Sequence, residues 1–357
     1  MTDKYTSSKI VAISFLLQIF VVLIHSINLI FNFGEESLKA QRTLNSFTQN
    51  FISKGLTNIA VPMFFIISGY LFFCKIKTGT TTEFKDKFKN RFKTLAIPYL
   101  FWSLSGILLF FILQSFPFSK PFFTKDLVQD YDFDKWIRTL FYLPIAAQLW
   151  FIRDLIVLII ISPLLYRLLS LTPKAILLFS FVFWCSNTRI YLFSPESLLF
   201  FLIGSYWGIS KISLQNLPRV KNSTLLLVLW IVLITVKTLL TENHFHIKWM
   251  VILLNKASII TGIIALWYFY DILYKDVDIT QKRYYVLFKY SFWIYVAHQP
   301  LLNIIKKALL SVMGFTNTTS FIVYLAAPLI TLLIIIPTAI LLRRYVPKFY
   351  FFTTGGR

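Results

Sequence analysis

The stretch that decides the fold class is IVAISFLLQIFVVLIHSINLIFNF, residues 10–33, which is long enough to cross a membrane as one helix. Apart from Gln18, the positions deep in this run are apolar or small until His25. An ionisable side chain is costly to bury at membrane depth, so it commonly faces a cavity, a pathway or a reactive centre. At about 1.5 Å per helical residue, His25 lies about 22 Å from Ile10, in the outer half of a hydrocarbon core about 30 Å thick. His25 is therefore a candidate site residue.

The composition of the whole chain is typical of a membrane protein. Hydrophobic residues make up 57% of the 357 residues, charged residues only 14%, and 38 residues are Phe. A water-soluble domain of this length does not need so apolar a balance. We predict a single all-α membrane helix bundle over residues 1–357, with its core at about residues 10–345. The apolar windows predict about ten spans, near residues 10–33, 56–74, 95–116, 145–168, 175–193, 196–213, 223–241, 247–273, 286–310 and 320–345.

The basic residues predict the orientation of the bundle. A net charge of +21 would suggest nucleic acid in a soluble domain, but the 36 Lys and Arg residues lie mostly in short linkers between apolar windows. They read as topology signals, so no nucleic-acid partner is expected. The even-numbered linkers and both termini hold the basic excess, whereas acids such as Glu36 and Asp132 accompany bases in linkers one and three. Both termini are therefore predicted to lie in the cytoplasm.

A second ionisable candidate, His298, lies in the segment YSFWIYVAHQP, residues 290–300. Pro300 lacks a backbone N–H, so it should bend the ninth helix directly after His298 and Gln299 and leave polar groups to be satisfied inside the bundle. Such a kink often borders a cavity. From the residues alone, a histidine that only hydrogen-bonds a neighbouring helix explains His25 or His298 equally well.

Arg153 follows Trp150 at the outer start of the fourth predicted helix. It could hold an anionic or sugar ligand, or it could snorkel to the membrane interface. Arg153 and Asp154 are adjacent and point about 100° apart on a helix, so we do not expect them to pair. Ser68 and Gly69 interrupt an aromatic helix, and such small residues allow either a ligand or another helix to approach closely.

Arg91 and Lys93 lie at the cytoplasmic mouth of the third predicted helix. They could hold the phosphate groups of a cofactor, although a basic cytoplasmic linker has the same composition. No metal site is expected. Cys74 and Cys185 have no second ligand at a suitable spacing, and the two histidines of the outer linker beside Glu242, which are His244 and His246, read as solvent-exposed.

Together these segments resemble the acyltransferase 3 family, which comprises bacterial integral-membrane O-acyltransferases that modify surface sugars. Each match is weak alone, but the set appears in the family's order over nearly the whole chain. The matching stretches are FVVLIHS (20–26), VPMFFIISGYL (61–71), RFK (91–93) leading to PYLFWS (98–103), LWFIRDL (149–155) with Pro163, and residues 290–300.

The resemblance implies a bundle in the bacterial cytoplasmic membrane in which the first-helix histidine, here His25, is catalytic. It also implies that an acyl-CoA donor arrives from the cytoplasm and that a basic residue near the third helix, here Arg91, is associated with it. The sequence departs from the family pattern at two places. Ser14 stands where many relatives carry an arginine, with Lys9 more than a turn further back, and Thr94 and Leu95 stand where a second basic residue would fall.

We therefore predict transfer of an acetyl or similar short acyl group from acyl-CoA to a carbohydrate hydroxyl of a surface polysaccharide or lipid-linked glycan. A thioester already has a good leaving group, so the main tasks are to align the hydroxyl and to remove its proton, with His25 as the base. The supporting residues would be His298, Arg153, Trp150 and Ser68, and the donor-binding residues would be Arg91 and Lys93.

Two other classes of protein are compatible with the same residues. In a transporter, His25 and His298 would lie on a proton or substrate path. The absence of a detectable inverted repeat, and of an intramembrane acid that would pair with a histidine, disfavours this class. A non-catalytic membrane scaffold is the third interpretation.

Overall fold

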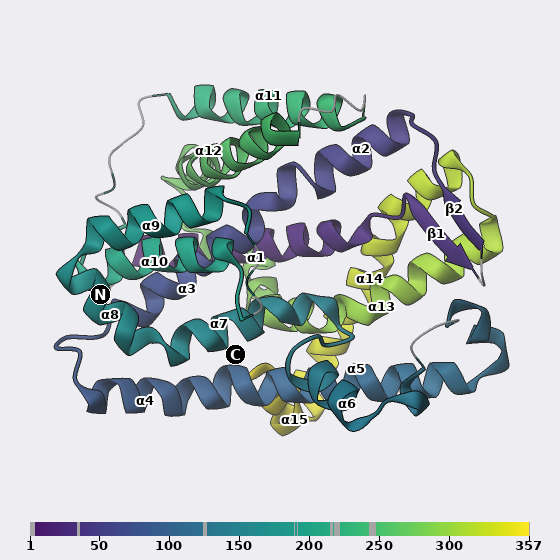
Figure 1. Ribbon diagram of the computed structural model, residues 1–357, viewed down its shortest axis with the longest axis horizontal. Coiled ribbons are helices and arrows are strands. Elements are labelled where there is room, and N and C mark those ends of the chain that lie inside the picture. The colour runs from purple at the N-terminus through teal and green to yellow at the C-terminus, as the bar shows by residue number, and fades with distance from the viewer. Residues whose placement is uncertain are drawn as a thin grey trace. The chain divides into compact units, whose positions relative to one another are not determined.

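The computed structural model describes residues 4–33, 36–123, 127–188, 190, 192–214, 217, 222–242 and 248–356, and these are almost entirely helical (Figure 1). The helices confirm the all-α fold class. The α-helices are α1 (Lys4–Ser26), α2 (Leu44–Ser53), α3 (Ala60–Phe73), α4 (Thr81–Arg91), α5 (Ile97–Ser115), α6 (Phe133–Phe141), α7 (Trp150–Ile160), α8 (Ser162–Leu171), α9 (Pro173–Cys185), α10 (Pro195–Ile209), α11 (Ser223–Glu242), α12 (Lys248–Tyr274), α13 (Ser291–Met313), α14 (Asn317–Tyr345) and α15 (Pro347–Thr354). The shorter elements are η1 (Leu56–Ile59), the π-helical turn η2 (Phe92–Ala96), η3 (Pro117–Phe122), η4 (Val128–Asp130), η5 (Ala147–Leu149), η6 (Ile279–Gln281), η7 (Arg283–Tyr290), β1 (Ile30–Phe33) and β2 (Glu36–Lys39).

Every predicted apolar window contains a helix, but ten membrane crossings are not confirmed. Within the described residues, six helices are long and apolar enough to cross a membrane. A bent pair, Ala147–Ile160 and Ser162–Leu171, would be a seventh span if its two halves, which meet at 63°, cross together. The six are Lys4–Ser26, Leu44–Phe73, Thr81–Ser115, Ser223–Glu242, Lys248–Tyr274 and Asn317–Tyr345.

The first apolar run ends its helix earlier than its hydropathy predicts. Helix α1 stops at Ser26, and the chain then enters the antiparallel hairpin of β1 and β2 (Figure 1). The backbone N–H of Asn28 donates to Gln49 Oε1 at 2.9 Å instead of continuing the helix. A side-chain partner thus competes with the helical ladder, as polar side chains commonly do at helix ends.

The described chain divides into two compact units, each assembled from three stretches of sequence. Unit 1 comprises Met1–Val21, Phe51–Arg91 and Asp154–Ser291. At its centre α3 packs along α10 through glycines, because a Cβ atom on Gly69 would collide with the Phe201 carbonyl and one on Gly204 with the Ile66 backbone. Small residues allow this close approach of helix backbones.

Unit 1 also buries Lys9, the residue directly before the first apolar window. Its exposed fraction is 3%. Its Nζ lies 2.7 Å from a carboxylate oxygen of Asp271 and 4.0 Å from the ring centroid of Trp267. Tyr5 donates its hydroxyl to the same carboxylate at 2.6 Å. Asp271 therefore neutralises the Lys9 charge inside this unit.

Unit 2 comprises Val22–Asn50, Phe92–Arg153 and Phe292–Arg357. An aromatic stack supports α13, because the ring of Trp293 lies 5.4 Å from that of Trp102 and 5.7 Å from that of the fully buried Tyr350. The indole of Trp102 donates to the Thr353 carbonyl at 3.0 Å. These contacts hold α13 against α5 and α15, and α13 carries His298.

Candidate active site

Unit 2 brings together the two histidines that come from opposite ends of the sequence. The ring centroids of His25, in the last turn of α1, and His298, in α13, are 5.4 Å apart, with an angle of 42° between the ring planes. His298 is fully buried and His25 is partly exposed. Two imidazoles at this separation can act on one small group, which is what a shared site requires.

The hydrogen bonds of His298 define which of its nitrogens carries the proton. Nδ1 lies 3.1 Å from the Ile294 carbonyl oxygen and 2.8 Å from that of Tyr295. Both oxygens are acceptors, so Nδ1 is the donor and Nε2 of the neutral ring keeps its lone pair. Nε2 is buried and has no hydrogen-bond partner in the described part of the chain. A buried acceptor without a partner is costly, and this one belongs to the ring that lies against His25, so it is available to a donor at this site.

The kink in α13 explains why polar groups gather beside His298. Gln299 has non-helical torsion angles, φ −109° and ψ 140°, which confirms the bend predicted from Pro300. Proline offers no N–H to the carbonyl of Val296, and the side-chain amide of Gln148 donates to that carbonyl instead, at 3.1 Å. The hydroxyl of Tyr295 donates back to the Gln148 carbonyl at 2.5 Å. The turn η5 is thereby tied to the kink.

The end of α1 that carries His25 is held from two sides. Lys306 Nζ donates to the carbonyl of His25 at 2.6 Å and to that of Ile27 at 3.2 Å, and a cation is favourable at a helix C-terminus. Beyond it, the Asn28 side chain accepts from Gln49 Nε2 at 2.8 Å and donates to the carbonyl of Ser320. These contacts fix the backbone of His25 while its ring nitrogens make no hydrogen bond within the described residues.

Neither Lys306 nor Gln148 was predicted from the sequence. Lys306 had a usable signal, because it is a lysine inside an apolar window, and such residues are rare and commonly functional. Gln148 had no comparable signal, since its partner is a carbonyl that becomes free only where another helix bends.

Arg153 and Trp150 belong to the same unit as the histidine pair. Arg153 Nη1 donates to the Tyr142 carbonyl at 2.8 Å, and its guanidinium carbon lies 4.8 Å from the Tyr142 ring. Trp150 is the first residue of α7 and is partly exposed. Asp154 accepts hydrogen bonds from Ser194 and Ser197 in unit 1. Through Tyr142, Arg153 contacts the loop before α7, and its role toward a ligand stays a prediction.

Ser68 belongs to unit 1, where it lies on α3 and is partly exposed. Its neighbour Gly69 is required for the packing of α3 on α10. This arrangement accounts for the Ser-Gly pair as a packing feature. It leaves the predicted supporting role of Ser68 without a contact that favours it.

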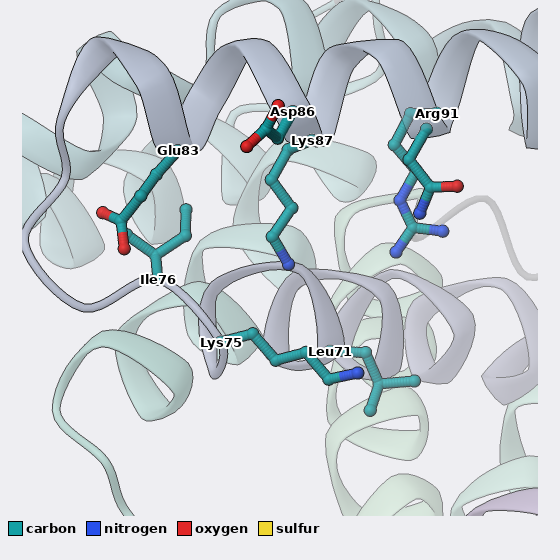
Figure 2. Close-up of a pocket in the computed structure, with 8 residues that line it drawn as sticks. Leu71, Lys75, Ile76, Glu83, Asp86, Lys87 and Arg91 are labelled. Carbon is teal, nitrogen blue, oxygen red and sulfur yellow. The ribbon is translucent and has the colours of Figure 1, made fainter.

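In unit 1, Arg91 borders a cavity of about 340 Å³ between α4 and the end of α3 (Figure 2). Figure 2 shows Lys87 and Arg91 reaching from α4 toward the segment that carries Leu71 and Lys75. Neither Lys87 nor Arg91 makes an ion pair within the described residues, and both cationic groups lie over the ring of Phe72, at 5.5 and 6.0 Å. The full lining is Leu71, Lys75, Ile76, Glu83, Asp86, Lys87, Asn90 and Arg91.

Two carboxylates also line this cavity, but one of them is already engaged. Glu83 accepts the backbone N–H groups of Lys77 at 3.0 Å and Gly79 at 2.8 Å, which caps the start of α4. These bonds keep Glu83 ionised, so the lining sets the three cationic groups of Lys75, Lys87 and Arg91 against two carboxylates and is electropositive by one charge. Such a cavity suits a phosphate-bearing ligand.

The remaining predicted residues are placed as follows. Lys93 lies exposed in η2, which belongs to unit 2, and Leu95 in the same turn is buried. His244 and His246 lie outside the described residues. Within the described part of the chain, no group of three or more His, Cys, Asp or Glu side chains could hold a metal ion.

The helical architecture agrees with what comparison with known sequences shows. The sequence model of the acyltransferase domain family matches residues 14–341, so the chain belongs to this family, the acyltransferase 3 family. With its apolar helices it is an integral membrane protein that acts on acyl groups.

One protein similar in sequence to this chain is the succinoglycan biosynthesis protein ExoH of Rhizobium meliloti (strain 1021). The two proteins are 28% identical over 315 residues, which cover 86% of this chain and 81% of the relative. No solved structure matches the chain.

Proposed function

We propose that this protein transfers an acetyl or similar short acyl group from acyl-CoA to a sugar hydroxyl of a surface polysaccharide or of its lipid-linked precursor. Family membership supports the acyl transfer, and the relative's role in succinoglycan biosynthesis supports a polysaccharide acceptor. The observation that carries the proposal is the histidine pair, with ring centroids 5.4 Å apart and an unpaired buried nitrogen on His298.

In the proposed reaction His25 acts as the general base. The hydroxyl oxygen attacks the thioester carbonyl carbon while its proton passes to the imidazole of His25. The C–S bond then breaks, and the proton on His25 is returned to the leaving thiolate, so that the products are the ester and free CoA. Holding the hydroxyl against the thioester supplies much of the rate enhancement, because it turns an encounter in solution into a reaction within one complex.

The electropositive cavity of unit 1 is the proposed site for the phosphates of the donor. Arg91 and Lys87 offer unpaired cationic groups at its wall, and Lys75 adds a third. Guanidinium and ammonium groups bind phosphate oxygens through charge-assisted hydrogen bonds. Lys93, exposed in η2 of unit 2, is kept as a further proposed donor-binding residue. The donor would come from the cytoplasm, with the protein in the bacterial cytoplasmic membrane and both termini on the cytoplasmic side.

The direct test is an assay of the purified protein in detergent with radiolabelled acetyl-CoA and an oligosaccharide acceptor. We expect acceptor-dependent release of free thiol together with label on the sugar, and a loss of about 10²- to 10⁴-fold in His25→Ala, the range typical of removing a general base. Reconstituted vesicles without acyl-CoA serve as the comparison. Sugar uptake by those vesicles, with no thiol release from the detergent sample, would instead indicate a transporter.

A further inference from the structure

We infer that His298 is a positioning residue for the proton transfer: its Nε2 accepts a hydrogen bond from the ring N–H of His25, which turns the other nitrogen of His25 toward the acceptor hydroxyl. The inference rests on the proposed function, and it assigns a distinct role to each histidine of the pair.

The need for such an acceptor follows from the chemistry of a neutral imidazole. The ring has one N–H donor and one lone pair, and it can remove a proton only through the lone pair. When His25 presents its lone pair to a hydroxyl, its opposite nitrogen carries a hydrogen that must find an acceptor. Lys306, the cation at this helix end, has only donors, and it uses them on backbone carbonyls.

The Nε2 atom of His298 can be that acceptor. Its Nδ1–H is committed to the carbonyls of Ile294 and Tyr295, so its Nε2 can only accept. That nitrogen is buried, has no other partner in the described residues, and belongs to the ring that lies against His25. In catalytic triads a third group likewise selects the tautomer of the base and stabilises its protonated form.

The rings of His25 and His298 lie close together but are not hydrogen-bonded to each other, as is common for catalytic groups before a substrate is present. A centroid separation of 5.4 Å lets the two rings approach to a direct hydrogen bond with a small rotation, or share one bridging water. The backbones on both sides are held, that of His25 by Lys306 and that of His298 by the hydrogen bonds between Gln148 and the kink. During the reaction only His25 gains and returns the proton, and His298 keeps its Nδ1–H throughout.

The test compares two substitutions of His298, one that keeps a donor near the position of Nδ1 and one that keeps an acceptor near the position of Nε2. In His298→Asn the amide nitrogen falls near the position of Nδ1, so the bonds to the backbone survive but the acceptor is lost. In His298→Gln the amide oxygen reaches the position of Nε2, so an acceptor remains. Ser311→Ala, an exposed position on the same helix, is the matched control.

We expect kcat to fall by about 10²- to 10⁴-fold in His298→Asn and the Gln variant to recover at least about tenfold of that loss. KM for acetyl-CoA should stay within about twofold, since the donor phosphates bind elsewhere. A reduced kcat at an unchanged KM separates a role in the chemical step from a role in donor binding.

Two outcomes would overturn the inference: wild-type kcat in His298→Asn, or equal losses of kcat in the Asn and Gln variants. Equal losses with reduced thermal stability would mark His298 as a structural residue. A wild-type protein that releases no thiol from acetyl-CoA would instead refute the proposed function, so the two failures are distinguishable.

Discussion

His25 lies at the point where α1 stops, and its neighbours hold its backbone more firmly than its ring. Lys306 binds the last carbonyls of the helix, and Asn28 is fixed by Gln49 and Ser320. The proposed role of His25 as a base needs this combination, because such a ring must be placed accurately and must still be available to its substrate. The fully buried His298 beside it is held through its own ring instead.

Lys306→Met should lower kcat about tenfold, because the end of α1 loses its cation and the backbone of His25 becomes less well placed. Lys307→Met is the matched control, since the Nζ of Lys307 lies on the Phe122 carbonyl and not on the carbonyls of α1. The measurement is steady-state thiol release at saturating acetyl-CoA. Equal activity in the two variants would contradict a positioning role for Lys306.

Arg91→Ala should raise KM for acetyl-CoA by about 10- to 100-fold, the range expected for the loss of one charge-assisted hydrogen bond to phosphate. Lys87→Ala should act in the same direction, and kcat at saturation should change little. Lys85→Ala provides the control, because Lys85 is exposed on the same helix and does not line the cavity. If the Arg91, Lys87 and Lys85 variants all had the same KM for acetyl-CoA, this cavity would not be the binding site of the donor phosphates.

The elements of this protein show which features local sequence can predict. The bend in α13 was predictable because a proline cannot donate to the carbonyl four residues before it, whatever surrounds it. The end of α1 was not predictable. The N–H of Asn28, just beyond that end, donates to the side chain of Gln49, and Gln49 comes from α2. The β-hairpin of β1 and β2 follows from that early end and was missed with it.

Glycine packing between α3 and α10 leads to a prediction about stability. Gly204→Ala should destabilise the protein by about 1–3 kcal/mol, because the added methyl group collides with the Ile66 backbone. Gly106→Ala is the control, since its Cβ would come no closer than 3.6 Å to a neighbour, and it should be neutral or stabilising by about 0.4–1 kcal/mol. Unfolding in detergent measures both. Equal stability of the two variants would contradict close packing at Gly204.

For the molecule as a whole, hydropathy located the helices and could not count the crossings. Helix α9 has only 13 residues, and α7 and α8 meet at 63°, so an apolar window need not be one straight span. Nor could the sequence alone pair His25 with His298, since pairing depends on how distant helices pack. The resemblance to a family predicted a catalytic role for His25, whereas its contact with His298 emerged only from the fold.

Orientation is predicted at this scale from the distribution of charge. A C-terminal fluorescent protein should fold and fluoresce, and a C-terminal alkaline phosphatase should be inactive, because both termini are expected in the cytoplasm. The same two reporters placed in the linker near residue 130, on the opposite side, should give the reverse pattern. Active phosphatase at the C-terminus would contradict the predicted orientation.

The most direct measurement of the central claim is the O-acyl content of the surface glycan, determined by mass spectrometry. It compares cells that carry the intact protein, a deletion, and His25→Ala at matched membrane abundance. We predict that one acyl mass disappears from the glycan in both altered strains and returns with the intact protein. Unchanged acylation in the deletion strain would contradict acyl transfer to this glycan, and acylation that persists in His25→Ala would contradict His25 as the base.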